Sequence, residues 1–287
     1  DLKNKFMVTH FFNPPRYMHL LELVKGENTS QDTYDIISNF AEKIINKGIV
    51  PAKDTPNFIG NRVGVFGIMS TINIAIKMGI DIETVDAFTG IISGRPKSAT
   101  FRTADIIGLD VLKNVAMTTY KKSKDDESIK MFEIPEPMEF LIKNGNLGQK
   151  TGSGFYKRDE NKNILVFDLD TKKYRKLKKI DLGIDQDIIA NGTIGQRINA
   201  LITLKSKNGV FFWEALSTML LYCVYRITEI SDRAEDIDNA MKWGFGWEIG
   251  PFELLNIVGL SQFVDRLNLN DKVVKNKINT ILTELDN

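Results

Sequence analysis

Two strand-like runs joined by a Pro–Pro turn near the start of the chain restrict its fold more than any other stretch. Residues 5–9 alternate and are rich in strand-forming side chains, and residues 19–24 form a second such run. Asn13 and the two prolines after it interrupt regular structure and turn the chain. A carboxylate such as Glu22, inside an apolar strand, is costly unless it has a partner. The turn brings His10 to the adjacent strand end, so we expect a His10–Glu22 pair.

A paired histidine and carboxylate form a common general base. A carboxylate bonded to one imidazole nitrogen fixes the tautomer of the ring and makes the other nitrogen a better proton acceptor. His10 is therefore predicted to take up a proton, and Glu22 is predicted to orient it. These two residues are called the dyad below.

The stretch around the dyad resembles the catalytic signature of L-3-hydroxyacyl-CoA dehydrogenases, the NAD-dependent enzymes of fatty-acid β-oxidation. The matching residues are His10-Phe11-Phe12-Asn13-Pro14, Met18, Leu20 and Glu22. Agreement over about twenty positions is more specific than a lone GxGxxG motif. The resemblance implies oxidation of an (S)-3-hydroxyacyl-CoA to a 3-oxoacyl-CoA with NAD. In that reaction His10 is the catalytic base, Glu22 orients it and Asn13 contacts the cofactor.

The glycine fingerprint that binds the NAD pyrophosphate does not follow any strand-like run of these 287 residues. The nearest glycine pair, Gly152 and Gly154, lies far downstream of the dyad. Members of the family carry the fingerprint, an active-site serine and lysines for the CoA nucleotide upstream of the histidine strand. We therefore expect an N-terminally truncated fragment that retains the base, lacks most of the cofactor site and is inactive alone.

The segment after the dyad has the pattern of the end of a Rossmann domain. A capped helix is predicted up to about Lys47. Its apolar residues at helical spacing are Ile36, Ile37, Phe40, Ala41, Ile44 and Ile45. Residues 49–54 form a short edge strand, because Pro51 cannot serve a central ladder position. Residues 1–54 are thus expected to be the last strand–strand–helix–strand piece of a Rossmann domain.

A second motif opens the long apolar helix predicted for residues 57–77. Thr55-Pro56 has the pattern of an N-cap followed by proline at the first helical position. The run KDTPNFIGNRVG resembles the domain junction of the same family. This implies that Asn61 reaches into the active site, toward a substrate carbonyl or the nicotinamide side of the cofactor. On the local sequence alone an ordinary surface amide is an equal alternative, and Arg62 is expected to be a structural ion-pair partner.

An internal repeat predicts two copies of one helical domain. Phe101, Asp105, Ile106, Gly108 and Leu109 recur at the same spacing as Phe252, Asn256, Ile257, Gly259 and Leu260. Upstream, Asp86 corresponds to Asp238. A repeat of this length indicates two domains and not a short-period solenoid. Long members of the family carry tandem copies, whereas in shorter members one copy pairs across a dimer. One hypothesis is that the second copy takes the place of a dimer partner.

The predicted fold is mainly α, with a Rossmann remnant followed by two related helical C-terminal domains and a β-hairpin linker. The predicted domains are 1–54 (Rossmann remnant), 55–157 (first helical copy), 158–204 (hairpin and helix linker) and 205–287 (second helical copy). Within the linker, residues 163–168 and 173–177 form the hairpin, and one helix follows over 185–205.

Three further features have a structural and a functional interpretation. The glycine-rich turn at 148–154 is a phosphate cradle or a structural turn that docks Phe155 and Tyr156. The lack of a preceding strand favours the structural turn. The basic cluster at 172–179 is a patch for the CoA phosphates or, more ordinarily, a solvated face of the linker. Cys223 lies in an apolar helix, so it is predicted to be core and not a nucleophile.

The composition argues against several other classes of function. A net charge of +1 lacks the basic surplus that nucleic-acid binding requires. The sequence has no long uncharged apolar run, so no membrane span is expected. A single cysteine fits a reducing cytoplasm. Two histidines without a Cys–His spacing predict no metal site, and no G-x-S-x-G elbow of a hydrolase occurs. The function predicted first is a dehydrogenase fragment, with or without a fused enoyl-CoA hydratase domain. The alternative is a non-catalytic helical assembly module with a vestigial Rossmann edge.

Overall fold

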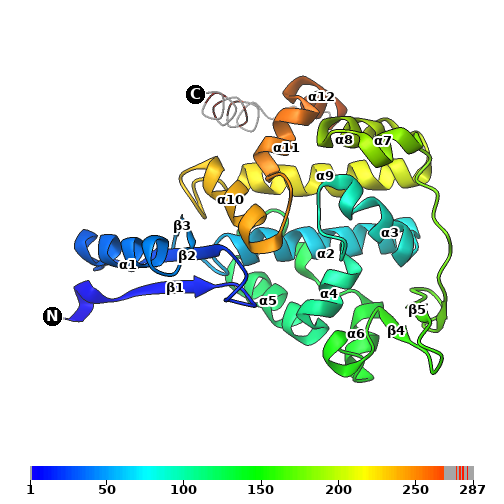
Figure 1. Ribbon diagram of the computed structural model, residues 1–287, viewed down its shortest axis with the longest axis horizontal. Helices are drawn as coiled ribbons and strands as arrows, with labels where there is room; N and C mark the ends of the chain where they lie inside the picture. Colours follow the sequence, from blue (N-terminus) through cyan, green and yellow to red (C-terminus); the bar gives the residue numbers. More distant parts are fainter. Residues whose placement is uncertain (1, 268–275, 277, 279, 281–282, 284–287) are drawn as a thin grey trace. The chain divides into compact units, whose positions relative to one another are not determined.

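The computed structural model describes residues 2–267 and residues 276, 278, 280 and 283 (Figure 1). The rest of 268–287, which ends the predicted second helical copy, lies outside the described residues. The chain divides into two compact units. The first unit comprises Asp1–Gly64 and Leu220–Asn287, and the second comprises Val65–Met219. The dyad and most of the second copy belong to the first unit, and the boundaries of the four predicted domains stay a prediction.

A three-stranded sheet opens the first unit after the short 3-10 helix η1 (Leu2–Lys5). Its strands are β1 (Met7–Phe11), β2 (Leu20–Lys25) and β3 (Gly48–Ala52). β2 lies in the middle, antiparallel to β1 and parallel to β3. This is the strand–strand–helix–strand piece of a Rossmann domain that the sequence predicts. β1 begins later than predicted because η1 takes up the first residues, so His10 lies within the strand.

Helix α1 (Gln31–Lys43) connects β2 to β3 and is shorter than predicted. Ser30 caps it by accepting a hydrogen bond from the Thr33 N–H, and the chain leaves helical geometry before Asn46, whose φ is 52°. Ala41 packs with Leu21 and Leu23 of β2. The other apolar stripe predicted for this helix is largely exposed to solvent, because the helix contacts the sheet through one face only. Its exposed residues are Ile36, Phe40, Ile44 and Ile45.

Helix α2 (Gly60–Met78) begins three residues later than predicted, and the predicted N-cap at Thr55-Pro56 is wrong. Asn57 and Phe58 have φ values of 67° and 52°, a left-handed conformation that a helix start cannot contain. The chain therefore makes a tight turn before the helix. This turn aims the first amides of α2 at the sheet, as described below for the dyad.

The second helical copy within the first unit consists of short helices around the end of α9 (Lys207–Arg226). They are α10 (Ala234–Phe245), α11 (Pro251–Val258) and α12 (Leu260–Arg266). α10 packs against β2 and β3 (Figure 1). Cys223 of α9 is fully buried among apolar side chains, as predicted.

The second unit contains the helices of the first copy that follow α2. They are α3 (Ile82–Phe88), α4 (Phe101–Ile107), α5 (Leu109–Lys122) and α6 (Glu136–Lys143), with 3-10 helices η2 (Ile91–Ser93), η3 (Ile129–Phe132) and η4 (Gln149–Thr151). Phenylalanine rings fill its core, for example Phe66 against Phe132 and Phe101 against Phe155.

The linker contains the predicted hairpin and one strand that was not predicted. β5 (Ile164–Phe167) and β6 (Tyr174–Lys176) pair antiparallel, and β4 (Tyr156–Arg158) joins the other edge of β5. The single helix predicted over 185–205 is wrong. It is split into α7 (Gln186–Asn191) and α8 (Ile194–Thr203), because Thr193 and Gln196 form a capping box that starts a new helix.

The internal repeat has a matching local geometry in the two copies. Gly108 joins α4 to α5 with φ 94°, and Gly259 joins α11 to α12 with φ 81°. Residues with a side chain rarely adopt such φ values, so the repeated glycine is required at both joints. Asp86 accepts hydrogen bonds from the start of α4, and Asp238 accepts them from the start of α11. The repeat is therefore structural as well as sequential.

Candidate active site

The structure brings His10 and Glu22 into direct contact. His10 on β1 is paired in register with Glu22 on β2, and His10 Nδ1 lies 2.5 Å from Glu22 Oε2. The Glu22 side chain is fully buried, whereas the His10 side chain is 28% exposed. One end of the pair is therefore shielded from water while the imidazole remains accessible to a reactant.

Two backbone amides hold the second oxygen of the Glu22 carboxylate. Oε1 accepts hydrogen bonds from the N–H of Ile59 at 2.9 Å and from that of Gly60 at 2.7 Å. Hydrogen-bond partners at both oxygens offset the cost of burying this polar group. A carboxylate oxygen can only accept, so in this pairing His10 Nδ1 is the donor. The lone pair of His10 Nε2 is then left to accept a proton.

The amides reach Glu22 because of the turn before α2 and the glycine that begins the helix. A Cβ built at Gly60 would lie 2.5 Å from Cζ of Phe12, so no side chain fits at this position. Phe12 in turn packs edge-on against the His10 ring, at 4.8 Å between centroids, and Phe58 lies on the same ring at 5.6 Å. The imidazole is thus fixed by the Glu22 carboxylate and by two aromatic rings.

A buried lysine holds the loop that connects the two dyad strands. Lys47, which is 9% exposed, donates from Nζ to the carbonyl oxygens of Pro15 at 2.5 Å and Met18 at 2.6 Å. Within the loop, the Pro14 carbonyl accepts from the N–H groups of Tyr17 and Met18. An ammonium group bonded to two carbonyls fixes the loop against β3 and so supports the register of the dyad strands.

The other two predicted site residues are Asn61, which follows an amide donor to Glu22, and Asn13, which follows the dyad strand β1. Asn61 is the second residue of α2, directly after the Gly60 amide that binds Glu22, and is partly buried. Asn13 is exposed at the end of the dyad strand segment. The functional roles of both amides, and the catalytic roles of His10 and Glu22, stay predictions. Arg62 is fully buried and bonds Glu229 and the hydroxyl of Tyr222, so the prediction of a structural ion pair is confirmed.

The glycine-rich turn at 148–154 is a structural turn. Oδ1 and Oδ2 of Asp105 accept the N–H groups of Phe155 at 2.8 Å and Tyr156 at 2.9 Å. A Cβ at Gly148 or at Gly154 would overlap Asp105, so the space beside these two glycines is already filled. The interpretation as a phosphate cradle is therefore wrong for these glycines, and the turn docks Phe155 on Phe101 as predicted.

Three side chains of the basic cluster at 172–179 are paired with carboxylates. Arg175, 24% exposed, contacts Glu83 at 2.5 Å, Asp168 at 3.0 Å and Asp81 at 3.1 Å. Two lysines of the cluster, Lys172 and Lys178, pair with Glu136 and Asp81. These contacts dock the linker on the first helical copy. The predicted solvated face is thus only partly solvated, and nothing in this pairing favours CoA phosphates.

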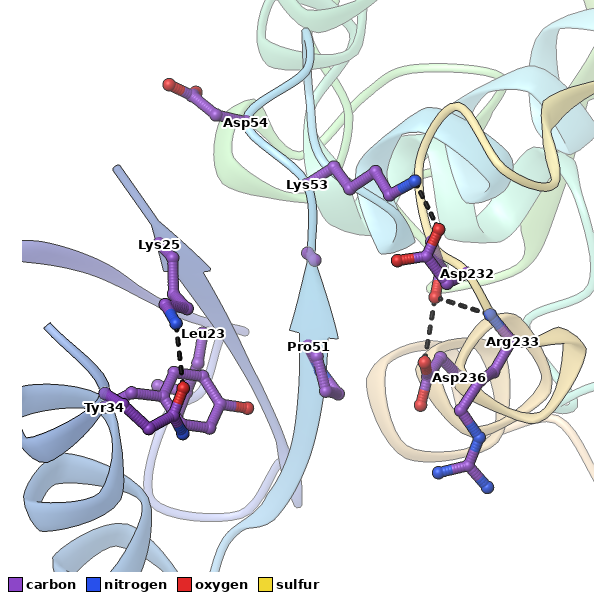
Figure 2. A pocket seen from close by; sticks show the side chains of 12 residues that line it. Leu23, Lys25, Tyr34, Pro51, Lys53, Asp54, Asp232, Arg233 and Asp236 are labelled. Atoms are coloured by element: carbon purple, nitrogen blue, oxygen red, sulfur yellow. Dashed lines mark hydrogen bonds and ion pairs between the residues drawn. The ribbon is translucent and has the colours of Figure 1, made fainter. Parts of the chain in front are cut away.

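A cavity of about 480 Å³ is lined by residues of β2, β3, α1 and the start of α10 (Figure 2). Leu23 and Lys25 line it, and side chains alternate along a strand, so it opens on the face opposite to Glu22. Figure 2 shows Pro51 of β3 between Tyr34 of α1 and the start of α10. Two of its charged groups, Lys53 and Asp232, pair with each other at 2.5 Å. This cavity is separate from the candidate site.

Sequence reasoning missed the residues that hold the dyad in place. Gly60 was visible as a glycine within the motif KDTPNFIGNRVG, and a glycine at a helix start can indicate close approach of another group. Lys47 precedes the glycine that ends the predicted helix, and no pattern marks it as buried. The rings of Phe12 and Phe58 belong to the two motifs, but their contact with His10 depends on the tertiary fold.

The fold and the site together define a class. A Rossmann-type α/β piece carries a partly buried histidine–glutamate pair and continues into two related helical copies. The family model of the NAD binding domain of 3-hydroxyacyl-CoA dehydrogenase matches residues 1–55. That of the C-terminal domain of the same enzyme matches residues 58–158 and again 211–283. The chain belongs to the 3-hydroxyacyl-CoA dehydrogenase family.

Relatives of known sequence agree with this family. A Bacillus subtilis protein described as a probable 3-hydroxyacyl-CoA dehydrogenase is 42% identical over 93% of this chain. A Rickettsia prowazekii protein described as a fatty acid oxidation complex trifunctional enzyme is 30% identical over 90%. The chain spans only 34% and 35% of the lengths of these two relatives.

Among solved structures, 3-hydroxybutyryl-CoA dehydrogenase from Escherichia coli K12 is similar with a TM-score of 0.66. The likeness covers 97% of this chain and 71% of that chain at 16% sequence identity, and so shows the fold alone.

In the described part of the chain, no helix combines the length and apolar character needed to cross a membrane. Over the same residues, no group of three or more His, Cys, Asp or Glu side chains is placed to hold a metal ion.

Proposed function

We propose that the protein to which this chain belongs oxidises (S)-3-hydroxyacyl-CoA to 3-oxoacyl-CoA, and that the chain supplies the group that takes up the hydroxyl proton. The observation that carries the proposal is the contact of His10 Nδ1 with a Glu22 carboxylate that is buried and held by two amides. Membership of the family supports the reaction, since the relatives are described as dehydrogenases of this substrate class.

Each residue of the dyad has one task in this proposal. The 3-hydroxyl of the substrate donates its proton to His10 Nε2 as the bond from C3 to hydrogen breaks. Glu22 keeps the ring in the Nδ1–H tautomer and stabilises the imidazolium that forms. Asn61, on the first turn of α2 beside the Glu22 amides, orients the substrate oxygen, and Asn13 contacts the cofactor.

NAD is the proposed cofactor, and it would accept the hydride that leaves C3. The match of residues 1–55 to an NAD binding domain supports this assignment. The glycine-rich turn at 148–154 does not fit the pyrophosphate of the cofactor, because Asp105 fills the space beside Gly148 and Gly154. We therefore expect these 287 residues to be inactive when tested alone.

Replacement of His10 by Gln in a full-length protein tests the proposal. General-base transfer contributes roughly 10²–10⁴-fold, so the rate of 3-hydroxyacyl-CoA oxidation should fall by at least that factor with an unchanged unfolding midpoint. The control is Asn39→Ala on the exposed face of α1, which should leave the rate unchanged. A loss below tenfold in His10→Gln would remove His10 from the reaction.

The alternative of a non-catalytic helical module leaves the buried Glu22 and its donors without a role. Fluorescence titration with NADH and acetoacetyl-CoA separates the two. The dehydrogenase binds both in its full-length form, whereas an assembly module binds neither.

The second helical copy is proposed to take the place of a dimer partner. Packing of α10 on β2 and β3 within one chain supports this proposal. A full-length mass above one chain on gel filtration would contradict it.

The protein is also proposed to act in the cytoplasm. A single cysteine, Cys223, supports a reducing compartment, and cell fractionation tests this.

A further inference from the structure

We propose that the end of α10, residues 243–245, is part of the scaffold of the dyad, and that Phe245 is a positioning residue that acts on His10 through Phe12. As a role in catalysis, this rests on the proposed function. Residues 243–245 are Trp243, Gly244 and Phe245, and they belong to the second helical copy. The second copy would then help to position the dyad of the Rossmann piece.

A chain of ring contacts connects Phe245 with His10. The Phe245 and Phe12 rings meet edge-on at 6.1 Å between centroids, and the Phe12 and His10 rings meet edge-on at 4.8 Å. Phe12 is 8% exposed, so its ring is enclosed and has little room for another rotamer. A shift of Phe245 is therefore transmitted to Phe12, and from Phe12 to the imidazole.

Glycines permit each close approach in this chain of contacts. A Cβ at Gly64 of α2 would overlap the Phe245 ring, and a Cβ at Gly60 would lie 2.5 Å from Phe12. At Gly244 itself, a Cβ would lie 2.6 Å from Leu20 and 3.3 Å from Phe12. Rings that pack on backbone without intervening side chains are held on several sides, which fixes their positions closely.

The rings of Phe12 and Phe245 also contact the first turns of α2, the helix whose amide holds Glu22. Phe12 lies over Gly60, whose N–H donates to Glu22 Oε1. Phe245 lies over Gly64, one turn further along the same helix. The aromatic end of α10 thus fixes the spacing between the histidine strand and the helix that orients the glutamate.

The first helical copy has no equivalent of this aromatic end. Counted from Asp86 and Asp238, the residues that correspond to 243–245 are Ile91, Ile92 and Ser93. Ile91 is 60% exposed. The aromatic residues are therefore a property of the second copy, beside the dyad, and not of the repeated fold.

A pair of glycine substitutions on α2 tests the proposal with a matched control. Gly64→Ala pushes Phe245 from its position, whereas a Cβ at Gly67 meets only Met219 Cγ at 3.7 Å, an ordinary contact. Both replace glycine by alanine inside the same helix. Phe245→Leu, which keeps an apolar side chain, removes the ring contact from the other side.

The first readout is the ¹⁵N spectrum of the His10 ring in the 287-residue chain, which needs no enzymatic activity. We expect Gly64→Ala and Phe245→Leu to shift the His10 nitrogens and to mix its tautomers, and Gly67→Ala to leave them unchanged. In the full-length protein, misplacement of a catalytic group by about 1 Å costs up to 10²-fold, so kcat should fall roughly tenfold or more with little change in KM.

Wild-type His10 resonances in both Gly64→Ala and Phe245→Leu would overturn the proposal, even if stability were reduced. If one of the two variants does not fold, the other decides. A full-length protein without dehydrogenase activity would contradict the proposed function only, because the spectrum of His10 would still test the positioning by Phe245.

Discussion

Asp86 in the first helical copy and Asp238 in the second occupy the same repeat position and have different surroundings. Asp86 accepts the N–H groups of Thr100, Phe101 and Arg102 and the hydroxyl of Tyr156. Within the described part of the chain, Asp238 accepts two N–H groups, from Phe252 and Glu253, and no hydroxyl. At the next repeat position Asp105 of the first copy, which binds the glycine-rich turn, is replaced by Asn256. The added bonds of the first copy hold its own linker, whereas the second copy contacts the dyad strands.

The comparison shows that a repeated framework has diverged in the segments attached to it. Both copies have an aspartate, Asp86 or Asp238, that accepts N–H groups from the start of the next helix. Amides at a helix start lack partners within the helix and must find other acceptors. Tyr156 and the glycine turn accompany the first copy, and the aromatic end of α10 belongs to the second. We infer that stability of the hairpin depends on the first copy and geometry of the dyad on the second.

Burial gives all three aspartates a raised pKa. It raises that of Asp86 to about 6, and those of Asp105 and Asp238 to about 7, although backbone hydrogen bonds act in the opposite direction. Burial, followed by the charge of Asp86, also raises the pKa of the Tyr156 hydroxyl. A carboxyl group whose pKa is raised by folding stabilises the protein most below its unfolded pKa. That contribution is lost as the pH rises through the folded pKa.

The largest expected difference between the copies is in the loss of their capping aspartates. Asp86→Ala leaves three amides and a tyrosine hydroxyl without their acceptor, and should cost about 3–4 kcal/mol of unfolding free energy. Asp238→Ala removes two such bonds and should cost about 2 kcal/mol. Urea denaturation measures both. Equal losses would show that the additional bonds of the first copy do not stabilise it.

The glycine-rich turn gives a smaller effect that is confined to the first copy. Gly154→Ala would place a Cβ on Asp105 Oδ1 and 2.6 Å from the Gly148 Cα, so the turn has to move, at a cost of about 2–3 kcal/mol. Gly67→Ala is the control, because space for a Cβ exists there. Thermal unfolding of the two variants checks this, and an unchanged midpoint in Gly154→Ala would contradict the packing described for the turn.

Asp105→Asn makes the first copy like the second at this position. Both oxygens of the carboxyl group carry lone pairs, also in the protonated form that prevails near pH 5, whereas the amide nitrogen of asparagine cannot accept an N–H bond. We therefore expect a loss of about 1–2 kcal/mol at that pH. The loss should shrink toward pH 8, because wild-type stability contributed by Asp105 declines between about pH 4 and 7, by at most ~1.4 kcal/mol per pH unit. Denaturant unfolding at the two pH values measures the slope. A loss that grows between pH 5 and pH 8 would contradict the raised pKa of Asp105.

The smallest expected effect is that of an exposed ion pair at the start of α5. Lys150 contacts Asp110 at 2.6 Å and lowers its pKa, and the second copy has Ser261 at the position of Asp110. Exposed pairs contribute about 0.2–1 kcal/mol and are screened by salt. Lys150→Ala should therefore change the unfolding free energy within that range at low salt, and less at 1 M. A larger change would mean that the turn depends on this pair.

Local pattern was sufficient for the dyad and insufficient for its support. Alternation along two strands and the turn between them placed His10 beside Glu22, because strand register is a short-range property. The donors from Ile59 and Gly60 depend on the left-handed turn at Asn57 and Phe58, which no propensity rule assigns to these residues. The apolar stripe of α1 is visible in the sequence, but its exposure is not, because sequence spacing shows that a face exists and not what covers it.

The repeat shows the same limit at longer range. Recurrence of the residues around Gly108 and Gly259 revealed two copies, since both glycines serve the same backbone conformation. The contact of Phe245 with Phe12 joins segments distant in sequence, and neither residue lies in a pattern that connects them.

The central claim is that Glu22 fixes the tautomer of His10 within this chain. The most direct measurement is the ¹⁵N spectrum of the His10 ring at pH 8 in the wild-type chain and in Glu22→Gln. We predict a protonated Nδ1 and an unprotonated Nε2 in the wild type, and a mixture of both tautomers in the variant. The same pair of nitrogen shifts in both proteins, or a protonated Nε2 in the wild type, would contradict the account.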